Sequence, residues 1–194
     1  MSGLSENFVF DYEIIGNISH SLTDDEISAL FSDDIELIKP VLAKDKNIVN
    51  HCFQELFLLD NGNYISRIST PLIKAVENNR HDVVDLLIEN GVDIDFRIPG
   101  EQTALFYSVI KGHYDMVCKL LDNNADPNGS HRYTPLMAAC GYGFYDIVKK
   151  LVCYGADPYI IHQNKYTAFG IAKETAGSEN ICKFLLEVFP NLDD

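Results

Sequence analysis

The sequence predicts an all-α fold, a solenoid of stacked helix pairs with about five units, the first of them degenerate. A threonine-led apolar phrase occurs four times, beginning at Thr70, Thr103, Thr134 and Thr167, at intervals of 33, 31 and 33 residues. Behind each lies a second apolar phrase, such as YDIVKKLVCYGADP, whose apolar residues have helical spacing. Repetition with this period indicates units that bury their apolar faces against their neighbours.

Each unit is predicted to contain two helices. The first begins at the threonine, because its hydroxyl can accept a hydrogen bond from a free main-chain amide and the following Pro or Ala fits the first turn. A small residue in this helix lets neighbouring helices approach closely; these residues are Ala75, Ser108, Ala139 and Ala172. A break such as 111–113 then reverses the chain. The second helix is expected to end where Gly91, Asn124 and Gly155 can adopt the left-handed conformation.

These phrases make the chain resemble the ankyrin repeat family. The match is densest from Tyr133 to Pro158 and extends over residues 67–194. The resemblance implies a curved stack of helix pairs with hairpin loops projecting from one edge. The glycine that the family has two residues before the threonine is replaced by Ile68, Glu101, Arg132 and Lys165. The histidine three residues after it is replaced by Ile73, Phe106, Met137 and Gly170.

The chain is divided into an N-terminal extension (1–20), a degenerate first unit (21–66) with an insertion near residues 51–68, and four units in residues 67–194, the last a C-terminal cap. Pro40 is expected inside the second helix of the first unit, where it removes a hydrogen bond and bends the helix. The insertion opens with an apolar run between Phe53 and Leu59. It is either an extra helix packed over the first repeat or an exposed finger for a partner. Packing is favoured, because exposed apolar patches promote aggregation.

The chain of 194 residues has a formal net charge of −14, from 29 acidic and 15 basic side chains. This charge repels phosphate backbones and anionic lipids, so we expect no nucleic-acid and no membrane partner, and a basic protein is a better match. Residues 1–50 hold ten acidic and three basic side chains. They form either an acidic docking patch or, more simply, a set of carboxylates that stabilise helix N-termini.

The first residues contain no basic leader, and no apolar run is long enough to span a membrane, so we expect neither a signal peptide nor a transmembrane helix. The five scattered cysteines form no CxxC pair and indicate reduced thiols. The expected location is cytoplasmic, and the chain alone is expected to be monomeric.

We expect no catalytic residues, no metal and no cofactor. The sequence contains no GxxxxGK[ST] phosphate loop, no HExxH zinc motif and no GxSxG nucleophile turn. One rival interpretation remains open: an enzyme subunit with a site in the 51–68 insertion, where His51 and Cys52 adjoin apolar residues.

The family resemblance implies that partners are held by the loop residues flanking each threonine and by the exposed end of each first helix. On this sequence the candidate protein-binding residues are Arg67, Glu77, Asn78, Gln102, Ile110, Lys111, His131, Tyr133, Tyr142, Asn164, Tyr166 and Glu174. In the first unit the helix-end positions fall on Phe31 and Ser32. Tyr133, Tyr142 and Tyr166 are expected to form a contiguous aromatic surface, because tyrosine offers a large rigid contact area and a hydroxyl.

The expected function is therefore a non-enzymatic protein–protein interaction module that binds a partner through its concave face and loop tips. Besides the enzyme-subunit interpretation, two alternatives stay open. One is an acidic inhibitor or immunity-type protein that occludes the basic cleft of a toxin or enzyme. The other is a microbial or viral effector.

Overall fold

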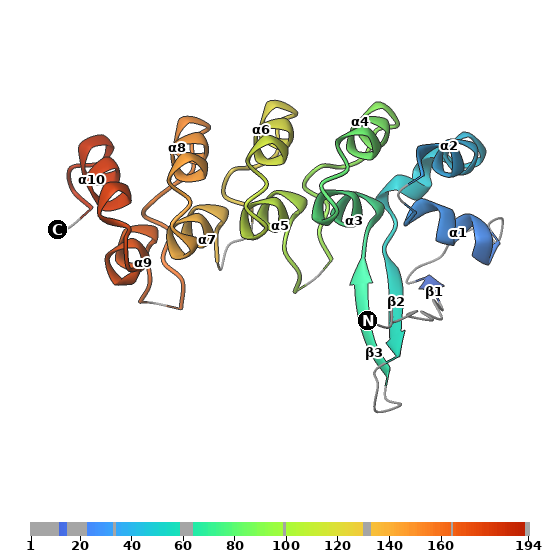
Figure 1. Ribbon diagram of the computed structural model, residues 1–194, viewed down its shortest axis with the longest axis horizontal. Coiled ribbons are helices and arrows are strands. Elements are labelled where there is room, and N and C mark those ends of the chain that lie inside the picture. The colour runs from blue at the N-terminus through green and yellow to red at the C-terminus, as the bar shows by residue number, and fades with distance from the viewer. Residues whose placement is uncertain are drawn as a thin grey trace, which may run out of the picture. The chain divides into compact units, whose positions relative to one another are not determined.

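The computed structural model describes residues 12–14, 23–32, 34–58, 64–98, 100–129, 133–163 and 165–192. The chain forms two compact units, an N-terminal unit of residues 1–93 and a C-terminal unit of residues 94–194. Figure 1 shows the helices and strands of both. The described part of the chain contains five helix pairs, which confirms the predicted repeat architecture and its degenerate first member.

The N-terminal unit begins its helical part with α1 (Asp24–Leu30) and α2 (Ile35–Lys44). A capping box starts α1: the Glu26 amide donates to Thr23 Oγ1 (3.3 Å), and the Thr23 amide donates to the Glu26 carboxylate (2.8 Å). Lys44 Nζ lies 3.0 Å from Glu26 Oε1 and so joins the end of α2 to the start of α1. The Thr23 amide, and then Lys44, lower the pKa of Glu26. This carboxylate therefore has a local structural role.

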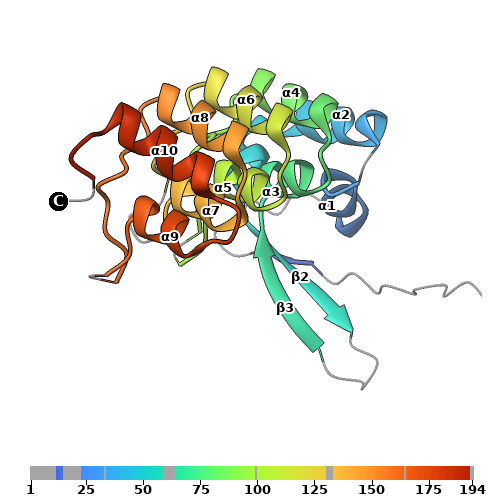
Figure 2. The ribbon, with the colours of Figure 1, turned by 60° about the vertical axis from the view of Figure 1, so that its left-hand side comes forward.

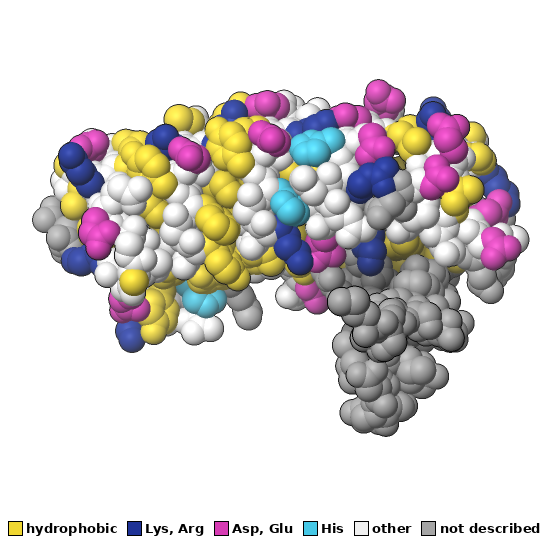
Figure 3. Space-filling model, in the orientation of Figure 1, with side chains coloured by type: hydrophobic (Ala, Val, Ile, Leu, Met, Phe, Trp, Pro, Cys, Tyr) yellow, Lys and Arg dark blue, Asp and Glu magenta, His cyan; other side chains and the backbone are white. Residues whose placement is uncertain are grey.

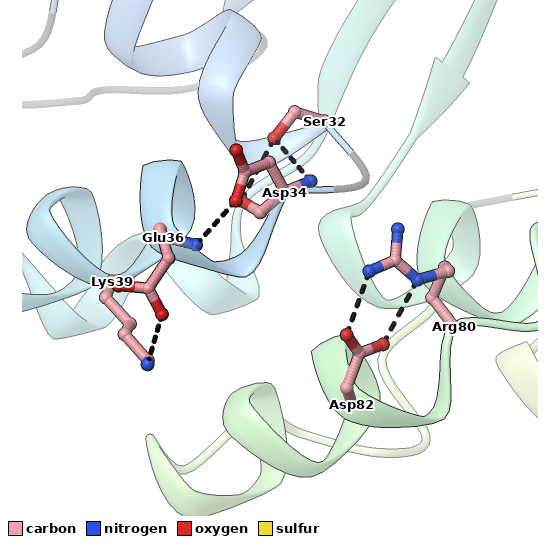
Figure 4. Close-up of polar contacts among 6 residues, drawn as sticks. All are labelled: Ser32, Asp34, Glu36, Lys39, Arg80 and Asp82. Carbon is pink, nitrogen blue, oxygen red and sulfur yellow. Dashed lines mark hydrogen bonds and ion pairs between the residues drawn. The ribbon is translucent and has the colours of Figure 1, made fainter.

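Helix α2 is capped by Asp34, whose carboxylate accepts a hydrogen bond from the Glu36 amide at 2.9 Å (Figure 4). The Asp34 amide donates in turn to Ser32 Oγ, at 3.2 Å. Pro40 lies inside the helix, as predicted, and α2 continues through it to Lys44. The free energy gained by burying Ile38, Val41 and Leu42 outweighs the loss of the main-chain hydrogen bond that proline cannot donate.

The second helix pair of this unit is α3 (Pro71–Glu77) and α4 (His81–Glu89). The Thr70 hydroxyl accepts from the Ile73 amide at 3.1 Å, which confirms the predicted threonine cap. At the start of α4, Arg80 makes two hydrogen bonds to Asp82, of 3.1 and 2.8 Å (Figure 4). The Arg80 guanidinium lowers the pKa of the Asp82 carboxyl.

The insertion is built from strands. After the short 3-10 helix η1 (Lys46–Asn50), β2 (Phe53–Leu58) pairs antiparallel with β3 (Tyr64–Ser69), so the expected extra helix is wrong. The alternating start of the run FQELFL and the Asn61-Gly62 dipeptide both favour a hairpin, although residues 59–63 lie outside the described part. Strand β1 (Tyr12–Ile14) pairs with β2, and the sheet order is β1-β2-β3. Figures 1 and 2 both show β2 and β3 extending away from α3 and α4.

The root of this hairpin belongs to the core of the N-terminal unit. Phe53 is 0% exposed, and its ring meets that of Phe31 edge to face, with centroids 5.2 Å apart. Packing on the core, the favoured interpretation, is thus confirmed at Phe53. Phe31 was expected on the binding surface, and that expectation is wrong, because the inserted strand covers it.

The C-terminal unit contains three helix pairs among its described residues. They are α5 (Ala104–Ile110) with α6 (Tyr114–Asp122), α7 (Pro135–Tyr142) with α8 (Tyr145–Cys153), and α9 (Ala168–Glu174) with α10 (Glu179–Val188). Figure 1 shows α5, α7 and α9 in one row and α6, α8 and α10 in a second. We call the first row the first-helix side. Apolar residues between the rows, such as Leu120, Leu136 and Leu151, are fully buried.

Local signals set these helix ends as predicted. The hydroxyls of Thr103, Thr134 and Thr167 accept from the amide three residues later, at 3.3, 3.2 and 3.0 Å. Asn124 and Gly155 take the left-handed conformation after α6 and α8, with φ of 67° and 88°.

Side chains from the loops link successive repeats. Each accepts a hydrogen bond from the main-chain amide of an aspartate one repeat further on: Asp95 from Asp126 (2.9 Å) and Asn128 from Asp157 (2.8 Å), with Asn50 from Asp93 (2.7 Å) in the N-terminal unit. Bonds of this kind contribute about 0.5–1.5 kcal/mol each. They give the loops a fixed register in a chain that lacks the family's histidine.

Candidate functional site

The predicted binding residues of the C-terminal unit fall at the two ends of the first helices. Gln102, Tyr133 and Tyr166 directly precede the capping threonines, and Ile110, Lys111, Tyr142 and Glu174 lie at the C-terminal ends of α5, α7 and α9. Lys111, Tyr142 and Glu174 are exposed, whereas Gln102, Ile110, Tyr133 and Tyr166 are half-buried. Two rows of candidate residues therefore border the first-helix side.

The other candidate residues lie elsewhere. Glu77 and Asn78 end α3 in the N-terminal unit; Glu77 is half-buried and Asn78 exposed. Arg67 belongs to β3, but its side chain lies outside the described part of the structure. His131 and Asn164 lie outside it entirely.

Tyr133 is held by aromatic packing on both sides. Its ring meets Phe106 and His162 edge to face, with centroids 6.0 and 5.3 Å away. Its hydroxyl lies 3.4 Å from the position that a Cβ on Gly141 would occupy, so the side chain runs along α7 toward Tyr142. Burial raises the pKa of the Tyr133 hydroxyl, and the neighbouring Tyr142 adds to this shift. The residue is thus a fixed part of the surface.

Tyr142 is the most exposed aromatic side chain of the described residues, at 59%. Its ring stacks on that of Phe144, with centroids 5.5 Å apart and planes 11° from parallel. Tyr142 is therefore solvent-accessible and yet restricted in orientation. Such a residue loses little side-chain entropy when a partner covers it.

Tyr166 joins this surface through the main chain. The His162 amide donates to the Tyr166 carbonyl at 2.7 Å, and the Tyr166 amide donates back at 3.0 Å. Lys165 Nζ lies 4.8 Å from the centroid of the Tyr166 ring. Within the described residues the structure brings Tyr133 beside Tyr142, and it connects Tyr166 to them by way of His162.

A groove that was not predicted from the sequence lies between the N-terminal ends of the second helices α6 and α8. It has a volume of about 380 Å³ and is lined by Gly112, Tyr114, Phe144, Tyr145, Asp146 and Ile147. Figure 3 shows hydrophobic side chains gathered on this face over α6 and α8 and continuing over α5 and α7. The sequence did contain a signal for it. Phe144 occupies the place after the turn glycine that His113 holds one repeat earlier, and Tyr142 and Tyr145 lie close to it in the segment YGFY.

Gly112 forms one wall of this groove and has a left-handed φ of 69°. A Cβ there would lie 3.2 Å from Phe144 Cζ. We expect Gly112→Ala to lower the free energy of unfolding by about 1–3 kcal/mol, from backbone strain and displacement of the Phe144 ring. Gly155→Ala is the control in the same unit, because its φ is 88° but no atom lies within 4 Å of the new Cβ. Urea denaturation that gave equal losses for both variants would contradict the contact with Phe144.

The histidine proposed for an enzyme site has a structural partner. His51 Nδ1 donates to the Asn47 carbonyl at 2.8 Å and so closes the end of η1. Throughout the described ranges, no group of three His, Cys, Asp or Glu side chains is placed to hold a metal ion. No described helix is both long enough and apolar enough to cross a membrane.

Helix pairs of one repeated design, capped by threonine and linked loop to loop, define a helical-repeat binding scaffold. A family model described as "Ankyrin repeats (3 copies)" matches residues 28–131 and 128–194. The chain therefore belongs to the ankyrin repeat family.

Three relatives of this chain are much longer proteins. The ankyrin repeat and KH domain-containing protein mask-1 of Caenorhabditis elegans is 30% identical over 174 residues, which are 86% of this chain and 6% of the relative. The fowlpox virus ankyrin repeat protein FPV034 is 34% identical over 80 residues, or 41% of this chain and 19% of the relative. Rabbit ankyrin repeat and SOCS box protein 5 is 35% identical over 75 residues, which are 38% of this chain and 23% of the relative. The chain thus spans less than a quarter of each of these three proteins.

Proposed function

We propose that this chain is a non-enzymatic protein-binding module whose partner contacts the first-helix side of the C-terminal unit around Tyr133 and Tyr142. Ankyrin repeats are protein–protein interaction modules, so family membership supports a binding role. The proposed location of the binding site rests on Tyr142, whose side chain is exposed and yet held in place by stacking on Phe144. Aromatic side chains of this kind supply much of the binding energy in protein interfaces.

The experiment compares partner capture by the wild type and by Tyr142→Ala, using lysate of the native organism and mass spectrometry. Calorimetry with the purified partner then measures affinity. Loss of a central aromatic anchor is expected to weaken binding about thirtyfold, corresponding to about 2 kcal/mol. The control is Tyr154→Ala, which removes an exposed tyrosine at the end of α8, on the other row of helices. Equal affinity of Tyr142→Ala and the wild type would refute the location.

An inhibitor that occludes the basic cleft of an enzyme or toxin is a second candidate, favoured by the net charge of −14. Electrostatic attraction of that origin accelerates association and weakens as salt screens it. The identity of the captured protein separates the two proposals. A partner with catalytic activity that falls when this chain is added supports inhibition, and an unaffected activity counts against it.

A further inference from the structure

The groove between α6 and α8 has the chemistry of a cation site. Three of its six lining residues are aromatic: Tyr114, Phe144 and Tyr145. Asp146 contributes a carboxylate, 74% exposed, and Tyr114 is 43% exposed. Aromatic faces attract cations through the ring quadrupole, and an adjacent carboxylate supplies the countercharge.

The chain itself shows that a cation is stable at this place. Lys149 Nζ lies 4.6 Å from the centroid of the Tyr145 ring and 2.9 Å from Asp146 Oδ1. The hydrogen bond to Asp146 raises the pKa of Lys149. This ion pair is largely exposed and therefore weak, so a better-fitting cation can replace the lysine.

We propose that the groove binds the guanidinium group of an arginine side chain on a partner protein, with Tyr114 and Phe144 beside its plane and Asp146 as its counter-ion. This inference rests on the proposed function, in which the partner is a protein. It adds that the partner places an arginine side chain in the groove.

The aromatic and carboxylate side chains that line the groove favour arginine over lysine. A guanidinium is planar and weakly hydrated, stacks on aromatic rings and can pair with a carboxylate through two donors. An ammonium group is strongly hydrated, and here it would compete with the chemically identical Lys149. The net charge of −14 favours a partner with basic side chains over one with acidic side chains.

The test is titration of the full chain with the peptide acetyl-Gly-Arg-Gly-amide, followed by amide chemical shifts in NMR. We expect saturable shifts at residues 112–114 and 144–147. The corresponding lysine peptide should bind at least about threefold more weakly, since it lacks the planar stacking group. The peptide in which neutral citrulline replaces arginine should not saturate. Equal binding of either comparison peptide, or no shift in the groove, would overturn the proposal.

Three variants test the assigned roles. Asp146→Asn should weaken binding of the arginine peptide about threefold or more, whereas Asp115→Asn, at the equivalent place in α6 but outside the groove lining, should leave it unchanged. Phe144→Leu should weaken it by about two- to fivefold. Lys149→Met should strengthen it, because the internal competitor is gone while the aliphatic stem is retained. Weaker binding by Lys149→Met would contradict the exchange of cations.

The peptide titration needs no natural partner, so its result is independent of the capture experiment. If Tyr142→Ala abolishes partner capture but the arginine peptide fails to bind, the inference falls and the proposed function stands.

Discussion

Replacing Phe53 with alanine is expected to lower the free energy of unfolding of the N-terminal unit by about 3–5 kcal/mol. The side chain is fully buried and in edge-to-face contact with Phe31, so alanine would leave a large cavity and also forfeit the ring contact. Hydrogen exchange of the α1–α4 amides, together with urea denaturation, measures the loss within this unit.

Two variants serve as controls for Phe53→Ala. Phe53→Leu keeps most of the apolar volume and should cost less than about 1.5 kcal/mol. Leu37→Ala removes a side chain that is 53% exposed on α2 and should change stability by no more than about 0.5 kcal/mol. A loss below about 1 kcal/mol for Phe53→Ala would mean that the hairpin is not anchored in this core.

Cys140 is expected to react with iodoacetamide at pH 8 at least about a thousandfold more slowly than Cys153. Cys140 is fully buried in α7, and burial raises the pKa of its thiol to about 12 from the ordinary 9.0, whereas Cys153 is exposed. The thiolate is the reactive form, so its population in the folded protein is very small at pH 8. Timed alkylation with mass spectrometry measures both rates, and in urea they should converge. Similar rates in the folded protein would contradict the burial of Cys140.

The same shift links Cys140 to stability at high pH. Its folded-state pKa lies above the unfolded value, so the folded protein retains the proton more strongly. The stabilising contribution is therefore complete below pH 9 and is lost as the pH rises toward 12. A buried thiol of this kind is a packing residue of α7 rather than a nucleophile.

The aromatic surface could be foreseen only in part. Tyr133 and Tyr142 were found because they occupy repeat positions that the core does not use. Phe144 directly precedes α8 and Tyr114 begins α6, and both were missed because they meet in one groove although they lie one repeat apart in the sequence. The exposure of Phe31 was predicted wrongly for a related reason, because Phe53 of the inserted strand β2 packs against its ring.

The sequence by itself determined the repeat, its helix ends and its turns. Threonine hydroxyls cap the amide three residues on, and Asn124 and Gly155 take positive φ, whatever lies nearby, because these interactions are local. Only the tertiary structure decided that the inserted hairpin is anchored in the core by Phe53 and that Gly112, Phe144 and Asp146 share one groove. Strand pairing and inter-repeat contacts join residues distant in sequence, and their energy depends on packing that local patterns do not record.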